Sequence, residues 1–85
     1  MVGSILSIHV VDARDVIPTP GYANANSYLK LSVDGQASKT LQVANNNDPV
    51  WDEVIIFDIR TGKEKLVVQL FDVQGGFVQN QNLVG

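Results

Sequence analysis

Apolar and polar positions alternate along most of the chain, and this period predicts strands rather than helices. Residues 4–13 (SILSIHVVDA) are rich in β-branched side chains, and residues 27–33 alternate Leu29, Leu31 and Val33 with polar neighbours. Residues 36–43, 54–59 and 65–73 predict three more strands, and residues 83–85 begin a similar pattern. Because turn residues separate these short strands, the pattern predicts an all-β antiparallel sandwich.

The pair Asp34-Gly35 predicts a hairpin between residues 27–33 and 36–43, because glycine tolerates a positive φ. A two-residue turn places Lys30 opposite Lys39 and leaves Leu41 away from the apolar face. A bulged, three-residue turn would instead place Leu41 opposite Leu29 and separate the two lysines. The sequence leaves both registers open.

Three long polar segments, at residues 14–26, 45–53 and 74–82, are expected to be loops. They follow the first, third and fifth predicted strands. In an antiparallel arrangement such loops emerge at the same end of the molecule, so a functional site is expected there. Trp51 follows a proline and is expected to anchor the second loop to the core.

Length and composition narrow the class of protein. With 85 residues the chain forms one small domain, and its 45% hydrophobic content is that of a soluble globular protein. The N-terminus has no basic region or cleavage site of a signal peptide, and no segment reaches the roughly 18 apolar residues of a membrane span. Six basic and nine acidic residues give a net charge of −3, which argues against nucleic acid as the main partner.

Catalysis has little support in the sequence. The chain has no cysteine, one histidine and no glycine-rich phosphate motif. His9 has no second transition-metal ligand near it in the sequence, and we expect a structural or surface role for it. Asp52 and Glu53 lack a third partner for acid–base chemistry and are expected to accept backbone hydrogen bonds. We therefore predict that the chain is not an enzyme.

Four segments together give the chain a family resemblance. They are LSIHVVDARDV, NSYLKLSVDGQASKT, NNNDPVWDEVIIFDI and KLVVQLFDV followed by NLVG. In this order and spacing they resemble a C2 domain, and Asp48-Pro49-Val50-Trp51-Asp52-Glu53 is the most specific piece. The resemblance implies an antiparallel Greek-key β-sandwich of eight strands, of which residues 1–85 contain about six. It follows as an expectation that the chain is a fragment or that strands of another chain complete it, as in a strand-swapped or edge-paired oligomer.

Many C2 domains bind calcium through about five aspartates, and the resemblance places these positions in the first and third loops. Here the positions hold Pro20, Asn26, Asp72, Gln74 and Asn82. Only one of these residues is a carboxylate, whereas calcium requires six to eight oxygens, several of them anionic. The sequence therefore predicts a disarmed site and no cofactor, with weak millimolar calcium binding left open.

The resemblance also directs attention to membrane contact. Tyr22 is expected near the tip of the first loop, and Phe77 and Val78 are expected in the third, where C2 domains carry membrane-inserting side chains. Phe77 could equally fold back over the core. Lys30 and Lys39 lie where the family has a lysine-rich sheet face, although two lysines are also compatible with an ordinary solvated surface.

Two functions follow from these expectations. The first is calcium-independent docking of a larger protein, as a cytoplasmic peripheral membrane module, to anionic phospholipid. The second is protein–protein contact or scaffolding by the same fold. Salt-sensitive binding to acidic vesicles would distinguish the first from the second.

Overall fold

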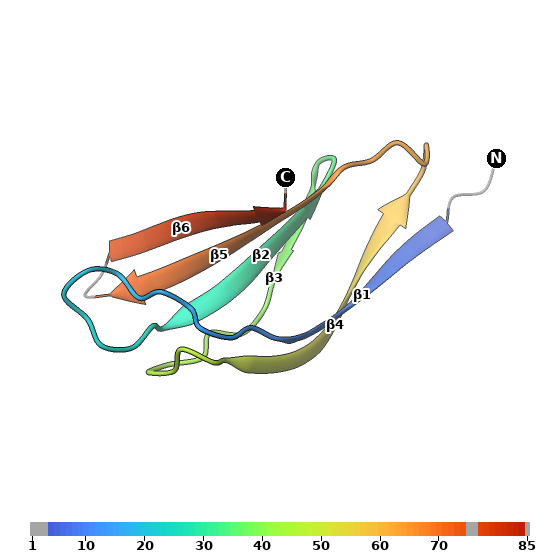
Figure 1. Cartoon of the computed structure of the whole chain (residues 1–85). Coiled ribbons are helices and arrows are strands. Elements are labelled where there is room, and N and C mark those ends of the chain that lie inside the picture. The colour runs from blue at the N-terminus through green and yellow to red at the C-terminus, as the bar shows by residue number, and fades with distance from the viewer. Residues whose placement is uncertain (1–3, 75–76, 85) are drawn as a thin grey trace.

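A computed structural model describes residues 4–74 and 77–84, and the side chains of residues 4–74. The described residues form six strands: β1 (Ser4–Asp12), β2 (Ser27–Val33), β3 (Gln36–Lys39), β4 (Val50–Ile59), β5 (Leu66–Gln74) and β6 (Phe77–Val84). They make two antiparallel sheets, one of β1 and β4 and one in the order β3-β2-β5-β6 (Figure 1). Within this part of the chain no helix is long and apolar enough to cross a membrane.

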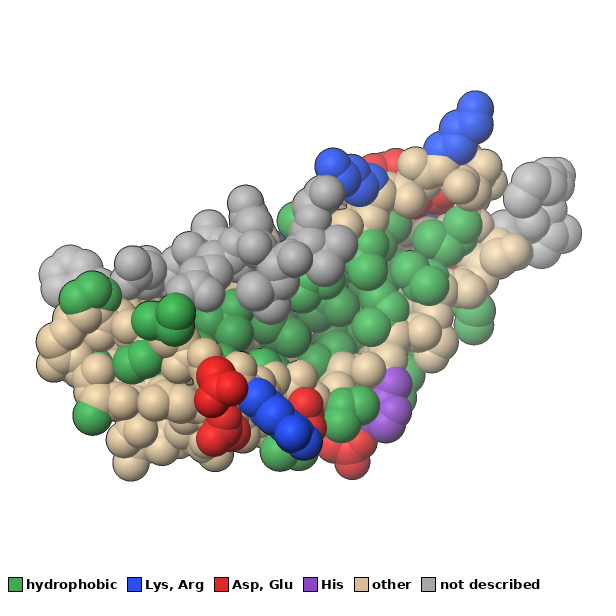
Figure 2. Space-filling view, viewed as in Figure 1, with side chains coloured by type: hydrophobic (Ala, Val, Ile, Leu, Met, Phe, Trp, Pro, Cys, Tyr) green, Lys and Arg blue, Asp and Glu red, His purple; other side chains and the backbone are tan. Residues whose placement is uncertain are grey.

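The two sheets share one apolar core, which confirms the all-β sandwich. Leu29, Leu31 and Val33 of β2 are buried because alternate side chains of a strand point to the same face. Trp51 and the other buried residues of β4 cover them from the second sheet. Figure 2 shows apolar side chains along the middle of the molecule, between β1 and the four-stranded sheet.

Gln36 ties the edges of the two sheets together. Its side-chain amide donates to the carbonyl oxygen of Asp58 in β4 at 2.8 Å, and its Oε1 accepts the Asp58 N–H at 3.0 Å. A side chain at the start of β3 thus satisfies both backbone groups of a residue at the edge of β4. This contact helps to fix how the β1–β4 sheet lies over the larger one.

The β2–β3 hairpin has the two-residue turn. Asp34 and Gly35 both have positive φ, at 26° and 83°, as a turn of this length requires. Lys30 consequently pairs with Lys39, and the register with a three-residue turn is wrong. Leu41 lies beyond the end of β3, with 77% of its surface exposed.

The expectation of a long loop at residues 74–82 is wrong. Gln74 pairs with Phe77, and the following residues continue as β6 beside β5. Phe77, Val78 and Asn82 are therefore strand positions, although their side chains lie outside those that the structure describes. The polar run Gln79-Asn80-Gln81-Asn82 has low intrinsic preference for a strand, and pairing with β5 overrides that preference.

Strand β4 begins earlier than the apolar pattern indicated, at Val50 rather than at Val54. The pairing with β1 shifts between Val10 and Asp12, so this strand contains a β-bulge. Asp52, at the bulge, has a φ of 49°. Trp51 is 7% exposed, which confirms that it anchors the chain to the core.

Candidate functional site

The predicted site lies at the end of the sandwich where the β1–β2 and β3–β4 loops meet the end of β5. The Val16 N–H donates to the carbonyl oxygen of Asn47, and the Asn46 N–H donates to that of Ala25, each at 2.9 Å. The Val73 N–H donates to the carbonyl oxygen of Asn26 at 2.9 Å. These bonds confirm that the first two loops and the end of β5 lie together (Figure 1).

Asp72 is the one carboxylate among the five degenerate calcium positions, and its two oxygens already have protein donors. Oδ2 accepts the N–H of Thr19 at 2.7 Å and its hydroxyl at 2.8 Å. Oδ1 accepts the Asn26 N–H at 2.9 Å and the Gln74 side-chain amide at 3.0 Å. With 4% of its surface exposed, the carboxylate connects the first loop to β5.

The pKa of Asp72 records the balance of two opposing effects. Burial is the largest single effect and raises the pKa of this carboxyl by penalising its charged form. The bonds from the Asn26 and Thr19 N–H groups, the Thr19 hydroxyl and the Gln74 amide together outweigh burial. The pKa of Asp72 is therefore held below its ordinary value, and the residue is a carboxylate at neutral pH.

The amides beside Asp72 are also bonded within the protein. Asn26 donates from Nδ2 to the Val73 carbonyl oxygen at 3.1 Å and to Oε1 of Gln74 at 3.0 Å, and its Oδ1 accepts the Asn45 N–H at 2.7 Å. Gln74 donates to the carbonyl oxygen of Asn24 at 2.7 Å. The side-chain oxygens that could replace the lost carboxylates as ligands thus already accept protein N–H groups.

This set of residues does not fit calcium. Pro20 has no side-chain oxygen, and the side chain of Asn82 lies outside the described residues. The remaining positions supply one carboxylate, surrounded by donors rather than by further acceptors, whereas the ion needs several anionic oxygens. Among the described residues no three or more His, Cys, Asp and Glu side chains group as a metal site.

Sequence reasoning missed Thr19 and most of the asparagines that join the loops. Asn47 accepts the N–H of Ala25 at 2.7 Å, and donates to the carbonyl oxygen of Ala23 at 3.1 Å. Asn24 donates to Oδ1 of Asn45 at 3.0 Å. The clustering of asparagine at residues 24–26 and 45–47 was the available signal, because this side chain readily bonds to nearby backbone.

Lys30 and Lys39 lie on the outer face of the four-stranded sheet, away from the loops. Together with Ala37 and Ser38 they line a shallow hollow of about 220 Å³. The Lys39 ammonium lies 5.5 Å from the centroid of the Tyr28 ring, and this ring stacks on Phe71 with centroids 5.2 Å apart. Two cations and two aromatic rings therefore share this face.

The structure also places Tyr22, His9 and Glu53, for which the sequence predicted a position or a role. Tyr22, in the β1–β2 loop, is 48% exposed. His9 lies on the surface, as expected, and its Nε2 contacts Oδ1 of Asp52 at 2.5 Å. Within the described part of the chain, Asp52 therefore bonds a side chain and not, as predicted, the backbone. Glu53 accepts the Leu41 N–H at 3.0 Å, which confirms a backbone-supporting role.

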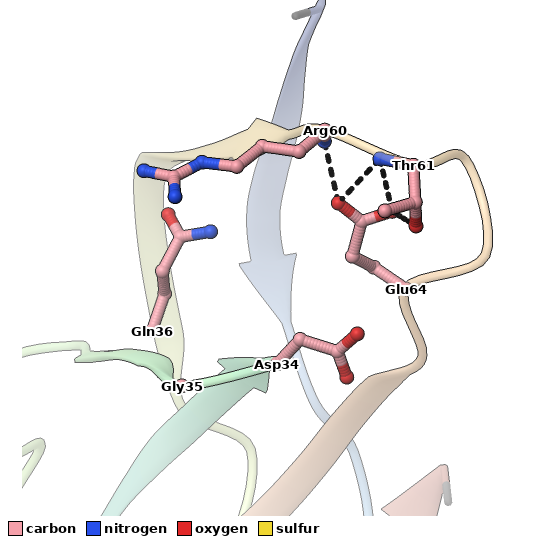
Figure 3. A pocket seen from close by; sticks show the side chains of 6 residues that line it. All are labelled: Asp34, Gly35, Gln36, Arg60, Thr61 and Glu64. Carbon is pink, nitrogen blue, oxygen red and sulfur yellow. Dashed lines mark hydrogen bonds between the residues drawn. The ribbon is translucent and has the colours of Figure 1, made fainter.

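The opposite end of the molecule has a pocket of about 340 Å³ between the β2–β3 turn and the β4–β5 connection (Figure 3). There Glu64 accepts the N–H groups of Arg60 and Thr61 and the Thr61 hydroxyl. The bond from the Arg60 N–H is the largest of the effects that lower the pKa of Glu64 to about 2. This carboxylate closes the turn that its own segment makes.

Comparison with known proteins supports the family resemblance that the four sequence segments indicated. Residues 4–85 match the C2 domain family. Multiple C2 and transmembrane domain-containing protein 2 of Mus musculus is 26% identical over 69 residues, which are 80% of this chain and 8% of that protein. Multiple C2 domain and transmembrane region protein 2 of Arabidopsis thaliana is 36% identical over 53 residues, 62% of this chain and 5% of that protein. The chain thus spans less than a tenth of the length of these relatives.

Proposed function

The chain belongs to the C2 domain family, and we propose that it is a non-catalytic module that docks a larger protein to anionic phospholipid membranes without calcium. The names of its relatives combine several C2 domains with transmembrane regions, which supports a position beside a membrane. In this proposal the chain acts at the cytoplasmic surface as a peripheral contact.

The Lys30–Lys39 pair carries the proposal. Like charges directly opposite each other on neighbouring strands are destabilising, and neither lysine forms an ion pair among the described residues. A phosphate between the ammonium groups would relieve this repulsion. The stacked rings of Tyr28 and Phe71 beside them suit the boundary between headgroups and acyl chains, where one side of an aromatic ring is wet and the other apolar.

The end of the sandwich where the β1–β2 and β3–β4 loops meet the end of β5, which we call the loop end, offers a second, weaker contact with the membrane. Tyr22 is half exposed there, and Phe77 and Val78 begin β6 beside the end of β5. Burying one aromatic side chain at an interface contributes roughly 1.5–3 kcal/mol. In this proposal these residues add to the lysine face and do not replace it.

Calcium independence is supported by the bonding of Asp72. A cation entering there would have to displace the Thr19, Asn26 and Gln74 donors from the carboxylate. In return, the cation would be coordinated by only one carboxylate, which carries a single negative charge.

Co-sedimentation with vesicles of phosphatidylcholine and phosphatidylserine, in calcium or in chelator, tests the proposal. We expect equal binding in both conditions, and weaker binding at higher salt. Since each lysine near an anionic surface contributes about 1 kcal/mol, Lys30→Ala with Lys39→Ala should weaken binding about 10- to 30-fold.

Lys63→Ala with Lys65→Ala is the matched control, because it removes the same charge from the β4–β5 connection. Equal losses in both double variants would show attraction by general charge and not by the β2–β3 face. Absence of binding in both conditions would contradict membrane docking, and binding only in calcium would contradict calcium independence.

A further inference from the structure

The outer face of the β1–β4 sheet carries an unusual number of exposed aliphatic side chains. Successive side chains of a strand point to opposite faces, so the residues between the buried ones face solvent. Five β-branched residues make up what we call the outer ribbon face, each at least half exposed: Ile5, Val11, Val50, Val54 and Ile56. Scattered exposed apolar residues are normal on a protein, whereas a contiguous patch marks an interaction site.

The strand register makes this face contiguous. Ile56 pairs with Ser7, so it lies diagonally across from Ile5 and next to Val54 on its own strand. Val54 pairs with His9, whose neighbour on the same face is Val11. The aliphatic side chains therefore form one stripe along the ribbon. They are stiff at χ1, so little side-chain entropy is lost when they are covered.

Apart from His9, the charged side chains of strands β1 and β4 are all acidic. Strands β1 and β4 contain Asp12, Asp52, Glu53 and Asp58 and no lysine or arginine. Asp52 is exposed and held by His9, while Asp12 and Asp58 pair with Val50 and Ile5 at the two ends of the stripe. Figure 2 shows the chain's single histidine beside acidic and apolar side chains at one edge of the molecule, where a basic side chain also lies among the acidic ones. The apolar stripe thus has an acidic border.

We propose that the outer ribbon face binds an amphipathic helix of a partner protein whose apolar stripe is bordered by lysine or arginine. Charge complementarity selects this occupant. An anionic membrane would meet the three aspartates, and a second copy packed about a two-fold axis would bring the same aspartates against them. Neither an anionic membrane nor a second copy of the chain is complementary in charge to the acidic border.

The dimensions agree with a helix. Two strands spaced about 4.8 Å apart, with their side chains, present a surface about as wide as a helix of roughly 10 Å diameter. The stripe from Ile5 to Val11 covers about 20 Å of strand, which corresponds to about 13 helical residues. The lysine pair lies on the outer face of the other sheet, so the two faces point away from each other.

Titration calorimetry of the 85-residue chain with a synthetic helix tests this inference. The probe is a peptide of about 14 residues with leucine at spacings of three and four and lysine along both borders of that stripe. A second peptide has glutamate in place of every lysine. We expect saturable one-to-one binding of the lysine peptide and none of the glutamate peptide.

Val54→Thr with Ile56→Thr should weaken binding of the lysine peptide at least tenfold, since threonine retains strand preference but removes apolar contact. Val67→Thr is the matched control, on the outer face of β5, and should leave binding unchanged; thermal melts check that each variant is folded.

The inference would be wrong if the Val54/Ile56 double variant bound the lysine peptide as tightly as the wild type does. It would also be wrong if the glutamate peptide bound as tightly as the lysine peptide. A dimer in sedimentation velocity that the same variant abolishes would also overturn it, because the occupant would then be a second copy. Absence of binding up to about 1 mM peptide would do so too.

Discussion

Asp72 has four donors around it and almost no contact with solvent, so its protonation should affect the free energy of unfolding. Its pKa is lowered in the folded protein. A carboxyl with a lowered folded-state pKa contributes stability that is fully present above its unfolded pKa of about 4 and is lost as the pH falls through the folded value. The chain should therefore lose stability as the pH falls below about 4, the ordinary value for aspartate.

Asp72→Asn tests this role. The asparagine amide would place hydrogens against N–H and hydroxyl donors, so we expect a loss of roughly 2–4 kcal/mol at neutral pH. The variant should also lose less stability than the wild type in acid, because its side chain does not titrate. Urea unfolding from pH 7 to pH 3 measures both effects.

Asp34→Asn, in the β2–β3 turn, removes an exposed carboxylate and is the control, with an expected change within about 0.5 kcal/mol. If Asp72→Asn were as stable as the wild type, or had the same acid slope, Asp72 would not hold the loop end together.

At the scale of elements, the loops are fixed by asparagine side chains rather than by apolar packing. Asn47 satisfies the N–H of Ala25, a residue with no exposed surface, and donates to the Ala23 carbonyl oxygen. Asn47→Ala would leave that buried N–H without its acceptor, which costs about 1–3 kcal/mol. We expect amide hydrogen exchange at Ala25 to accelerate at least tenfold, with less change in β2.

Asn46→Ala is the matched control, because Asn46 accepts only the nearby Asp48 N–H among the side-chain bonds of the described residues. Exchange at Ala25 that is equally fast in both variants would mean that the loop opens independently of the Asn47 contact.

The strands and the hairpin could be predicted because their signals are local. Alternating Leu29, Leu31 and Val33 define a buried face, and Asp34-Gly35 marks the position of the turn, although not its length. Strand β6 was missed because its polar run resembles a loop, and only its pairing with β5 makes this run a strand.

The donors around Asp72 were missed for a related reason. Thr19 and Asn26 approach Asp72 from 53 and 46 residues away along the chain, through loop geometry that no periodicity encodes. By contrast, the shortage of carboxylates at the loop end was visible in the residues themselves.

At the scale of the whole molecule, ligand binding to the native state raises the free energy of unfolding. A calcium site with micromolar affinity would add about 4 kcal/mol at 1 mM calcium. For a domain of this size, 1 kcal/mol corresponds to about 4–8 °C in Tm, so even modest binding would be visible. Because the Asp72 oxygens are already bonded, we expect Tm to agree within about 1 °C between 1 mM calcium and chelator.

Scanning calorimetry measures this comparison, with magnesium at equal ionic strength as the control for screening. A rise of several degrees in calcium alone would mean that the loop network rearranges around the ion. A rise that begins only above about 10 mM calcium would correspond to the weak millimolar binding that the sequence leaves open. Equal Tm values in all three solutions would mean that the fold is stable without the ion, and the association with membranes would then depend on the Lys30–Lys39 face and the exposed loop end.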